Sequence, residues 1–308
     1  MKVQERKFSF QSKFDGVPIH GVCMVPEQPV AILQMVHGMS EHKGRYLSFM
    51  QTMAEKGYIT VMHDCRGHGE SVKCEGDIGY CYDSLETGYI GDIYKITQQF
   101  KREYPGLPLI LYGHSMGSLA ARVYLRNHDD AIDGLILSGC PSYNDFVPGG
   151  LWLAKMFKKW KGERFRSSLM QKMVTGSFES RFRSEKRKYA WLAAKESVGE
   201  EFMKDELCMF TYTLNGFENL LNLEYITYRA IGYRMANPDL PILFISGMDD
   251  PCYINESKWQ QAIHRMKKLG YNDVQEIRYD NMRHEIHNEE DNDMVFQDID
   301  EFCRGIIS

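Results

Sequence analysis

Apolar and polar positions follow two different periods along this chain. Short apolar runs, the length of buried strands, are separated by segments in which apolar residues recur every three or four positions, as on one face of a helix. The predicted strands cover residues 30–36, 58–62, 109–112, 134–138, 240–246 and 274–279. The predicted helices cover residues 46–56, 89–104, 119–127, 256–269 and 291–304. Buried strands that alternate with amphipathic helices predict an α/β fold with a mostly parallel, doubly wound sheet.

Two further strands are predicted at the start of the chain. Residues 7–14 and 18–25 are apolar or alternating in character, and the turn FDGVP at residues 14–18 separates them. Two strands joined by a short turn pair in antiparallel fashion. We therefore expect a hairpin ahead of the parallel strands.

The strand rhythm disappears between Pro141 and Asn237, where the sequence becomes aromatic, Met-rich and helical in pattern. Residues 151–157 and 202–214 are predicted amphipathic helices. We interpret residues 141–237 as a helical cap, inserted between two strands and placed over the carboxyl ends of the sheet, where ligands bind. The predicted core then consists of residues 1–140 and 238–308.

Composition excludes some functional classes. The chain has 308 residues, 43% hydrophobic and 26% charged, and a formal net charge of −5. An acidic chain argues against a nucleic-acid partner, since such proteins are usually basic. We find no apolar block of a signal peptide and no apolar stretch long enough to span a membrane.

The eight cysteines are scattered and include no CxxC pair. Several lie inside apolar runs, where a cysteine is usually a small core residue. Cys74 and Cys81 are close in sequence, but no third or fourth ligand for a metal lies nearby. We therefore expect no disulfide or metal site there, and a cytoplasmic protein.

The most informative segment is LILYGHSMGSLAA, residues 109–121. An apolar strand ends in G-x-S-x-G and continues into small, helix-favouring residues, the setting in which a serine becomes a nucleophile. Gly113 and Gly117 are expected to flank Ser115 because a side chain at either position would collide with a neighbouring strand or helix.

A serine nucleophile needs a base, and the base needs an orienting acid, in the chain order Ser, acid, His for this arrangement. Asp249 and Asp250 follow the predicted strand 240–246, and His284 follows the strand 274–279. All three side chains are thus predicted at the carboxyl ends of strands. Taken singly, Asp250 could be a turn residue before Pro251 and His284 a surface loop residue.

Acyl transfer also needs two backbone N–H groups facing the oxyanion. One is predicted at Met116, directly after the serine. The other is predicted at Met39, in the loop after strand 30–36, where Gly38 allows close approach of the backbone. This chemistry requires no metal and no organic cofactor, and we expect neither.

Four motifs together resemble the monoacylglycerol lipase and lysophospholipase branch of the α/β-hydrolases. They are HGMSEHKGRY at 37–46, DCRGHGES at 64–71, GHSMG at 113–117 and MRHEIHNE at 282–289. The resemblance implies the α/β-hydrolase fold, the acid at Asp250 and the base at His284. Side chains of the motifs that we expect to brace loops are Glu41, His42, Arg45, Arg66 and His68.

The resemblance also implies hydrolysis of a carboxylic ester of a fatty acyl chain, with the cap forming an apolar acyl pocket. A peptidase or amidase of the same fold remains an alternative. A buried acidic pair in the cap that could hold an amine would favour it, and we identify none in the sequence. An acyltransferase and a non-catalytic ligand receptor are further alternatives. A dehalogenase is disfavoured, because its nucleophile is a carboxylate.

Basic residues are concentrated in the first half of the predicted cap. Lys and Arg outnumber Asp and Glu between Leu151 and Ala190 although the chain as a whole is acidic. Such a run usually forms a solvated outer face. The sharper hypothesis is that Lys158, Lys159 and Lys161, interleaved with Phe157 and Trp160, contact anionic lipid surfaces.

Overall fold

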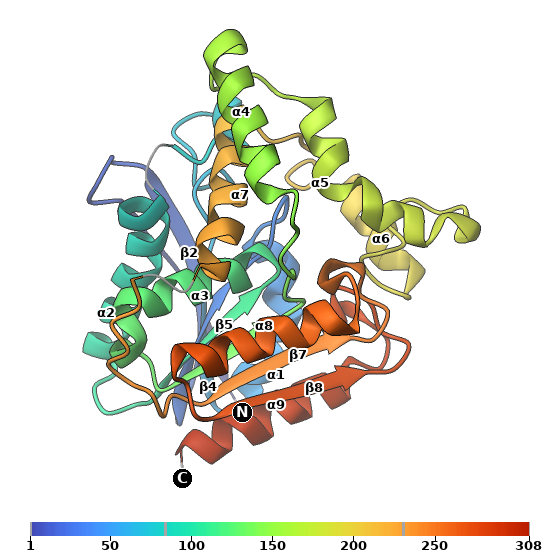
Figure 1. Cartoon of the computed structure of the whole chain (residues 1–308). Helices are drawn as coiled ribbons and strands as arrows, with labels where there is room; N and C mark the ends of the chain where they lie inside the picture. The colour runs from blue at the N-terminus through green and yellow to red at the C-terminus, as the bar shows by residue number, and fades with distance from the viewer. Residues whose placement is uncertain (1, 83–84, 230–231, 308) are drawn as a thin grey trace.

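A twisted sheet of eight strands forms the centre of the computed structural model, which describes residues 2–82, 85–229 and 232–307 (Figure 1). The strand order is β1-β2-β4-β3-β5-β6-β7-β8. The strands are β1 Val3–Gln11, β2 Pro18–Pro26, β3 Ala31–Val36, β4 Tyr58–His63, β5 Leu109–His114, β6 Gly134–Ser138, β7 Ile242–Gly247 and β8 Val274–Tyr279. β2 pairs antiparallel with both β1 and β4, and every other neighbouring pair is parallel. The predicted mostly parallel sheet is confirmed.

Helices cover both faces of this sheet. Apolar side chains of α1 Leu47–Glu55 and α9 Asn292–Ile307 pack on one face. Those of α2 Gly91–Glu103, α3 Met116–His128 and α8 Glu256–Leu269 pack on the other. Every residue of β3 to β7 is buried between these layers, and the sequences of these strands are accordingly mostly apolar.

The helix α8 was predicted with its observed bounds, and its ends show why. The Asn255 side chain accepts a hydrogen bond from Lys258 N–H at 3.0 Å, which caps the first turn. Gly270 follows the last turn with φ +111°, a conformation that favours glycine at a helix end. Both signals are local, so they are readable from sequence.

The first strand differs from its prediction. β1 begins at Val3 and ends at Gln11, whereas residues 7–14 were expected. It is an edge strand whose side chains are mostly exposed, so its polar sequence carries little apolar signal. Pairing of its backbone with β2 makes it a strand.

The segment between Ser138 and Ile242 adds no strand to the sheet in the part of the chain that is described. It holds α4 Val147–Lys161, α5 Ser168–Arg181, α6 Glu196–Lys204 and α7 Leu214–Tyr228. Figure 1 shows these helices gathered on one side of the sheet. This arrangement agrees with a cap over residues 141–237, and the domain division stays a proposal.

The predicted helix over residues 202–214 is wrong. α6 ends at Lys204 and α7 begins at Leu214, and residues 205–213 form an irregular loop between them. Asp205 starts a tight turn by accepting a hydrogen bond from Leu207 N–H at 2.9 Å, and Thr213 caps α7. The apolar residues of this loop, such as Phe210 and Tyr212, pack inward on the core and so imitate helical spacing.

The helices of the described residues include none with the length and apolar character that a membrane-crossing segment needs.

Candidate active site

Ser115 lies at a sharp turn between β5 and α3. Its backbone adopts φ 52° and ψ −116°, a strained conformation for a residue with a side chain. A Cβ on Gly117 would lie 2.2 Å from Val36 O, and one on Gly113 would lie 2.5 Å from Gly117 O. The two glycines are therefore required by the close contact of β3, β5 and α3, as the sequence predicted.

Asp250 and His284 meet at the carboxyl ends of β7 and β8. His284 Nδ1 lies 3.0 Å from Asp250 Oδ2 and 3.1 Å from Oδ1, and both side chains are buried. Cys252 N–H and the Ser246 hydroxyl also donate to the Asp250 carboxylate, at 2.8 and 2.9 Å. Asp249, in contrast, is exposed. The structure thus pairs the histidine with the second aspartate of the sequence.

Burial and charge set the protonation of this pair. Burial on its own would raise the pKa of Asp250, but the charge and hydrogen bond of His284, with the two other donors, hold that pKa below its ordinary value. Burial would lower the pKa of His284, and the Asp250 carboxylate more than offsets this, so that its pKa is raised. The pair suits a base whose charged form is stabilised as it takes a proton.

Ser115 and His284 line the same cavity, but no hydrogen bond joins them within the described part of the chain. His284 Nε2 instead lies 3.8 Å from Cys252 Sγ. The imidazole ring is flanked by the rings of His114 and Trp191, at centroid distances of 4.7 and 5.1 Å. A contact between serine and base therefore has to tighten when substrate binds, as is common for unliganded sites.

Met39 and Met116, the two predicted oxyanion donors, both line this cavity. Met116 is the first residue of α3, where an N–H has no partner inside the helix. Among the described residues, neither the Met39 N–H nor the Met116 N–H has a hydrogen-bond acceptor. Two unpaired donors beside a nucleophile are what an oxyanion hole requires.

A buried charge network lies beside these donors. Glu41 accepts hydrogen bonds from Gly38 N–H and from the Tyr46 hydroxyl, and Arg45 forms an ion pair with Glu285. Burial, together with the nearby charge of Glu285, raises the pKa of Glu41 to about 7. The sequence indicated bracing roles for Glu41 and Arg45 but not their link to Glu285, the residue directly after the base.

The other expected bracing residues also connect distant segments. Arg66 donates to Asp92 and to Asp15, at 2.6 and 2.7 Å, and His68 Nε2 contacts the Tyr212 hydroxyl. These contacts hold the loop after β4 against α2, the N-terminal hairpin and the segment before α7.

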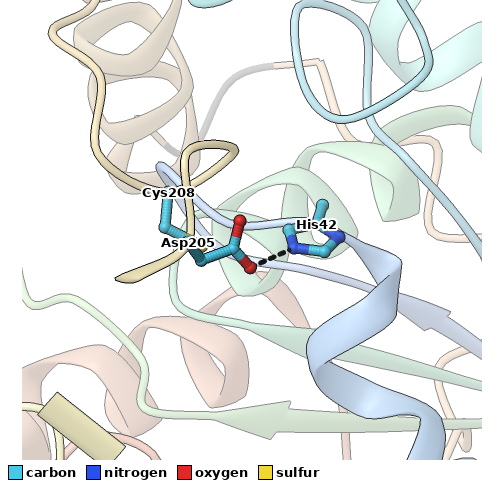
Figure 2. Close-up of side chains that lie close together, drawn as sticks. All are labelled: His42, Asp205 and Cys208. Atoms are coloured by element: carbon cyan, nitrogen blue, oxygen red, sulfur yellow. Dashed lines mark hydrogen bonds and ion pairs between the residues drawn. The ribbon is translucent and has the colours of Figure 1, made fainter. Parts of the chain in front are cut away.

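His42, Asp205 and Cys208 form a cluster whose atom types could bind a metal ion (Figure 2). The hydrogen bonds of His42 favour a different role. Its Nδ1 accepts from Gly44 N–H at 3.2 Å, so Nε2 carries the proton, which it donates to Asp205 Oδ2 at 2.7 Å. The ring thus presents a proton to the cluster, and the contact ties the loop after β3 to residues 205–208.

The cavity in front of Ser115 has a volume of about 530 Å³. Most of its wall away from the sheet is apolar and comes from α5, α7 and the loop between α6 and α7. Representative lining residues are Met170, Val174, Phe178, Phe210, Leu220 and Leu221. Four glutamates also line it: Glu179 and Glu224 in this wall, and Glu41 and Glu285 from the loop after β3 and the segment that carries His284.

Sequence reasoning missed Cys252, Trp191 and Glu285 as neighbours of the base. Cys252 and Glu285 are each within two residues of a predicted catalytic residue, so proximity in sequence was an available signal. No sequence signal pointed to Trp191, because it lies far from His284 in the chain. Its carbonyl oxygen accepts a hydrogen bond from His284 N–H at 3.4 Å.

Comparison with known families gives one extensive match. The family described as "Serine aminopeptidase, S33" matches residues 27–291. A solved carboxyl esterase from Bacillus coagulans, in complex with glycerol, superposes with a TM-score of 0.90 at 26% identity and covers 99% of both chains.

Two curated relatives are similar over shorter stretches. Phospholipase YtpA of Bacillus subtilis is 33% identical over 113 residues, which cover 36% of this chain and 41% of the relative. Human monoglyceride lipase is 30% identical over 109 residues, which cover 35% of this chain and 34% of the relative. The match therefore spans less than half the length of either relative.

Proposed function

Because the chain belongs to the serine aminopeptidase S33 family of α/β-hydrolases, in the branch that includes monoglyceride lipases, we propose that it hydrolyses carboxylic esters of fatty acyl chains. The observation that carries the proposal is the strained Ser115 elbow, which shares one largely apolar cavity with His284, the partner of Asp250. An apolar cavity beside a serine nucleophile suits an acyl chain attached to an ester carbonyl.

The proposed mechanism has two steps. Ser115 Oγ attacks the ester carbonyl while His284 takes its proton, and Asp250 orients and stabilises the imidazolium. The oxyanion accepts hydrogen bonds from the N–H groups of Met39 and Met116. His284 then protonates the leaving alcohol, and a water molecule deprotonated by the same base releases the fatty acid from Ser115.

A substrate panel tests this function. With 4-nitrophenyl esters of increasing chain length, kcat/KM is expected to rise by up to about fourfold per added CH₂ until the cavity is filled, since burying one CH₂ contributes about 0.8 kcal/mol. Monoacylglycerol and lysophosphatidylcholine complete the panel and report the preferred alcohol. A preference for the shortest esters would contradict fatty-acyl specificity and point to a general esterase.

Amide hydrolysis is a second candidate, favoured by one observation. The carboxylates of Glu179 and Glu224 line the cavity, where either could face an amine on the substrate. Burial raises the pKa of Glu224 to about 7, against the lowering effects of Asn144 N–H and Arg122. Aminoacyl 4-nitroanilides in the same panel distinguish the two functions, because an esterase leaves them intact.

We also propose that α4 contacts anionic lipid surfaces. Trp152 and Trp160 are 66% and 81% exposed, and Lys155, Lys159 and Lys161 are exposed on the same helix. Aromatic and basic residues together suit an interface with anionic headgroups. Two of the residues that the sequence suggested for this lipid contact are less available for it. Lys158 pairs with Glu218 at 3.0 Å, and Phe157 packs partly buried on the core.

Reversing two of these charges tests the contact. Lys155→Glu with Lys159→Glu is expected to weaken binding to anionic vesicles at low salt by about 30-fold or more, since each basic residue contributes about 1 kcal/mol. The matched control is Lys7→Glu with Lys13→Glu, at exposed positions on and after β1. Vesicle co-sedimentation measures both. Equal binding by the two variants, or binding indifferent to salt, would contradict the proposal.

The cytoplasm remains the proposed compartment. The scattered spacing of the eight cysteines supports it, and each of the eight is a free thiol in the structure.

A further inference from the structure

The backbone of Gly38 is wedged between the nucleophile and a buried carboxyl group. A Cβ on Gly38 would lie 2.6 Å from Glu41 Oε1 and 3.0 Å from Ser115 Cβ. Glu41 itself is 3% exposed and comes from the same loop, three residues further on. Any shift of this carboxyl group is therefore expected to move the Gly38 backbone, which faces the serine.

Two side chains hold the peptide groups on either side of Gly38. Glu41 Oε1 accepts the hydrogen bond of Gly38 N–H, and His37 Nδ1 lies 2.8 Å from Gly38 O. His37 Nε2 accepts from Cys65 N–H at 2.8 Å, so the ring carries its proton on Nδ1 and donates it to Gly38 O. The hydrogen bond of Glu41 to the N–H restrains φ of Gly38, and the hydrogen bond of His37 to the C=O restrains ψ.

This arrangement sets the direction of the Met39 N–H. Gly38 C=O and Met39 N–H belong to one planar peptide group, in which they point in opposite directions. Holding the carbonyl on His37 and the preceding N–H on Glu41 therefore aims the Met39 N–H. That N–H is one of the two donors of the proposed oxyanion hole, so the inference rests on the function proposed above.

We propose that Glu41 is a positioning residue for the oxyanion hole, acting through Gly38 on the Met39 N–H. The carboxyl group is held in place by its own contacts. The Tyr46 hydroxyl donates to Oε1 at 2.8 Å, and Arg45 Nε lies 3.6 Å from Oε2. Arg45 also pairs with Glu285, beside the base. Glu41 thus connects the oxyanion loop to the segment that carries His284.

A competing role for Glu41 is direct binding of the alcohol part of the substrate. The residue lines the cavity, and its Oε2 has no hydrogen-bond donor among the described residues. The two roles predict different kinetics. A donor aimed at the oxyanion acts in the transition state and changes kcat, whereas a contact with the alcohol changes KM for glycerol esters and spares 4-nitrophenyl esters.

The test compares Glu41→Gln, Glu41→Asp and Glu41→Ala on a 4-nitrophenyl ester and on a monoacylglycerol. Gln keeps an acceptor at the same reach and is expected to keep kcat within about tenfold of the unmodified protein. Asp keeps the charge beside Arg45 but is one methylene shorter, so we expect it to fold and to lose more than about tenfold in kcat. Ala is expected to lose about 10²- to 10³-fold in kcat. KM is expected to change little in all three.

Glu70→Gln is the matched control, because Glu70 pairs with Lys43 near the same loop, its side chain is 59% exposed, and it lies outside the cavity. Unchanged kcat in both Glu41→Asp and Glu41→Gln would overturn the positioning role, and so would an effect limited to a higher KM for the glycerol ester. Either result would leave the proposed ester hydrolysis intact. If the unmodified protein cleaves no ester, the proposed function fails and the inference fails with it. Because the Asp variant keeps the buried charge, a Glu41→Ala protein that does not fold still leaves these outcomes decisive.

Discussion

Replacing Ser115 with alanine is expected to lower kcat for ester hydrolysis by about 10⁴- to 10⁶-fold. In the proposed mechanism Ser115 Oγ forms the acyl-enzyme, and without it the remaining groups can only polarise the ester for attack by water. Steady-state hydrolysis of a 4-nitrophenyl ester measures the loss. Labelling by a fluorophosphonate, which reacts with activated serines, is expected to disappear in the same variant.

The fold is expected to survive this substitution. Among the described residues, Ser115 Oγ makes no hydrogen bond, so its removal leaves no buried partner unpaired. Alanine meets the same backbone strain at φ 52° as serine does. The free energy of unfolding should therefore change by less than about 0.5 kcal/mol. Residual labelling of a folded Ser115→Ala protein would show that the nucleophile is another residue.

Replacing Asp250 with asparagine is expected to lower kcat by about 10³- to 10⁴-fold. The carboxylate now accepts the Nδ1 proton of His284 and leaves Nε2 free to take a proton. An asparagine amide group can donate to Nδ1 instead, which moves the ring proton to Nε2 and blocks the base. Asp249→Asn is the control in the adjacent position. Since that side chain is exposed, its kcat should stay within about twofold. The reverse order of effects would show that the acid is misassigned.

The pH dependence of kcat/KM gives an independent readout of the same pair. Only neutral His284 can accept a proton, so activity rises with pH through the pKa of this residue. Asp250 raises that pKa above its ordinary value. In Asp250→Asn the largest effect that raises this pKa is absent, so burial lowers the pKa against only the smaller effects of Glu285 and Glu41. The rise in activity is therefore expected to move to lower pH in the variant, while Asp249→Asn keeps the original profile.

The predictions for Ser115 and Asp250 both assume that the serine and the base come into contact during the reaction. In the structure, His284 Nε2 faces Cys252 Sγ at 3.8 Å instead of Ser115 Oγ. The ring is held by Asp250 on one side and packed between His114 and Trp191. Rotation of the serine hydroxyl and the imidazole toward each other would complete the proposed triad, and a bound ester carbonyl would favour it.

Much of the core was predictable from the sequence because its signals are local. β8 Val274–Tyr279 and α8 Glu256–Leu269 were predicted with their observed bounds, since their apolar pattern and the capping Asn255 and Gly270 lie within or directly beside these elements. The elbow at Ser115 was predictable for the same reason. The order of serine, acid and histidine after three strands placed all three at one edge, because parallel strands share the direction in which they end.

What the sequence could not determine depends on contacts between residues that lie far apart in the chain. The loop 205–213 looks helical by spacing, and its shape follows from contacts such as that of Asp205 with His42, 163 positions away. The identity of the cavity wall, the packing of Trp191 on the base and the pairing of Arg45 with Glu285 have the same origin. Periodicity records which face of an element is buried, whereas only the folded chain decides which remote side chain is buried against it.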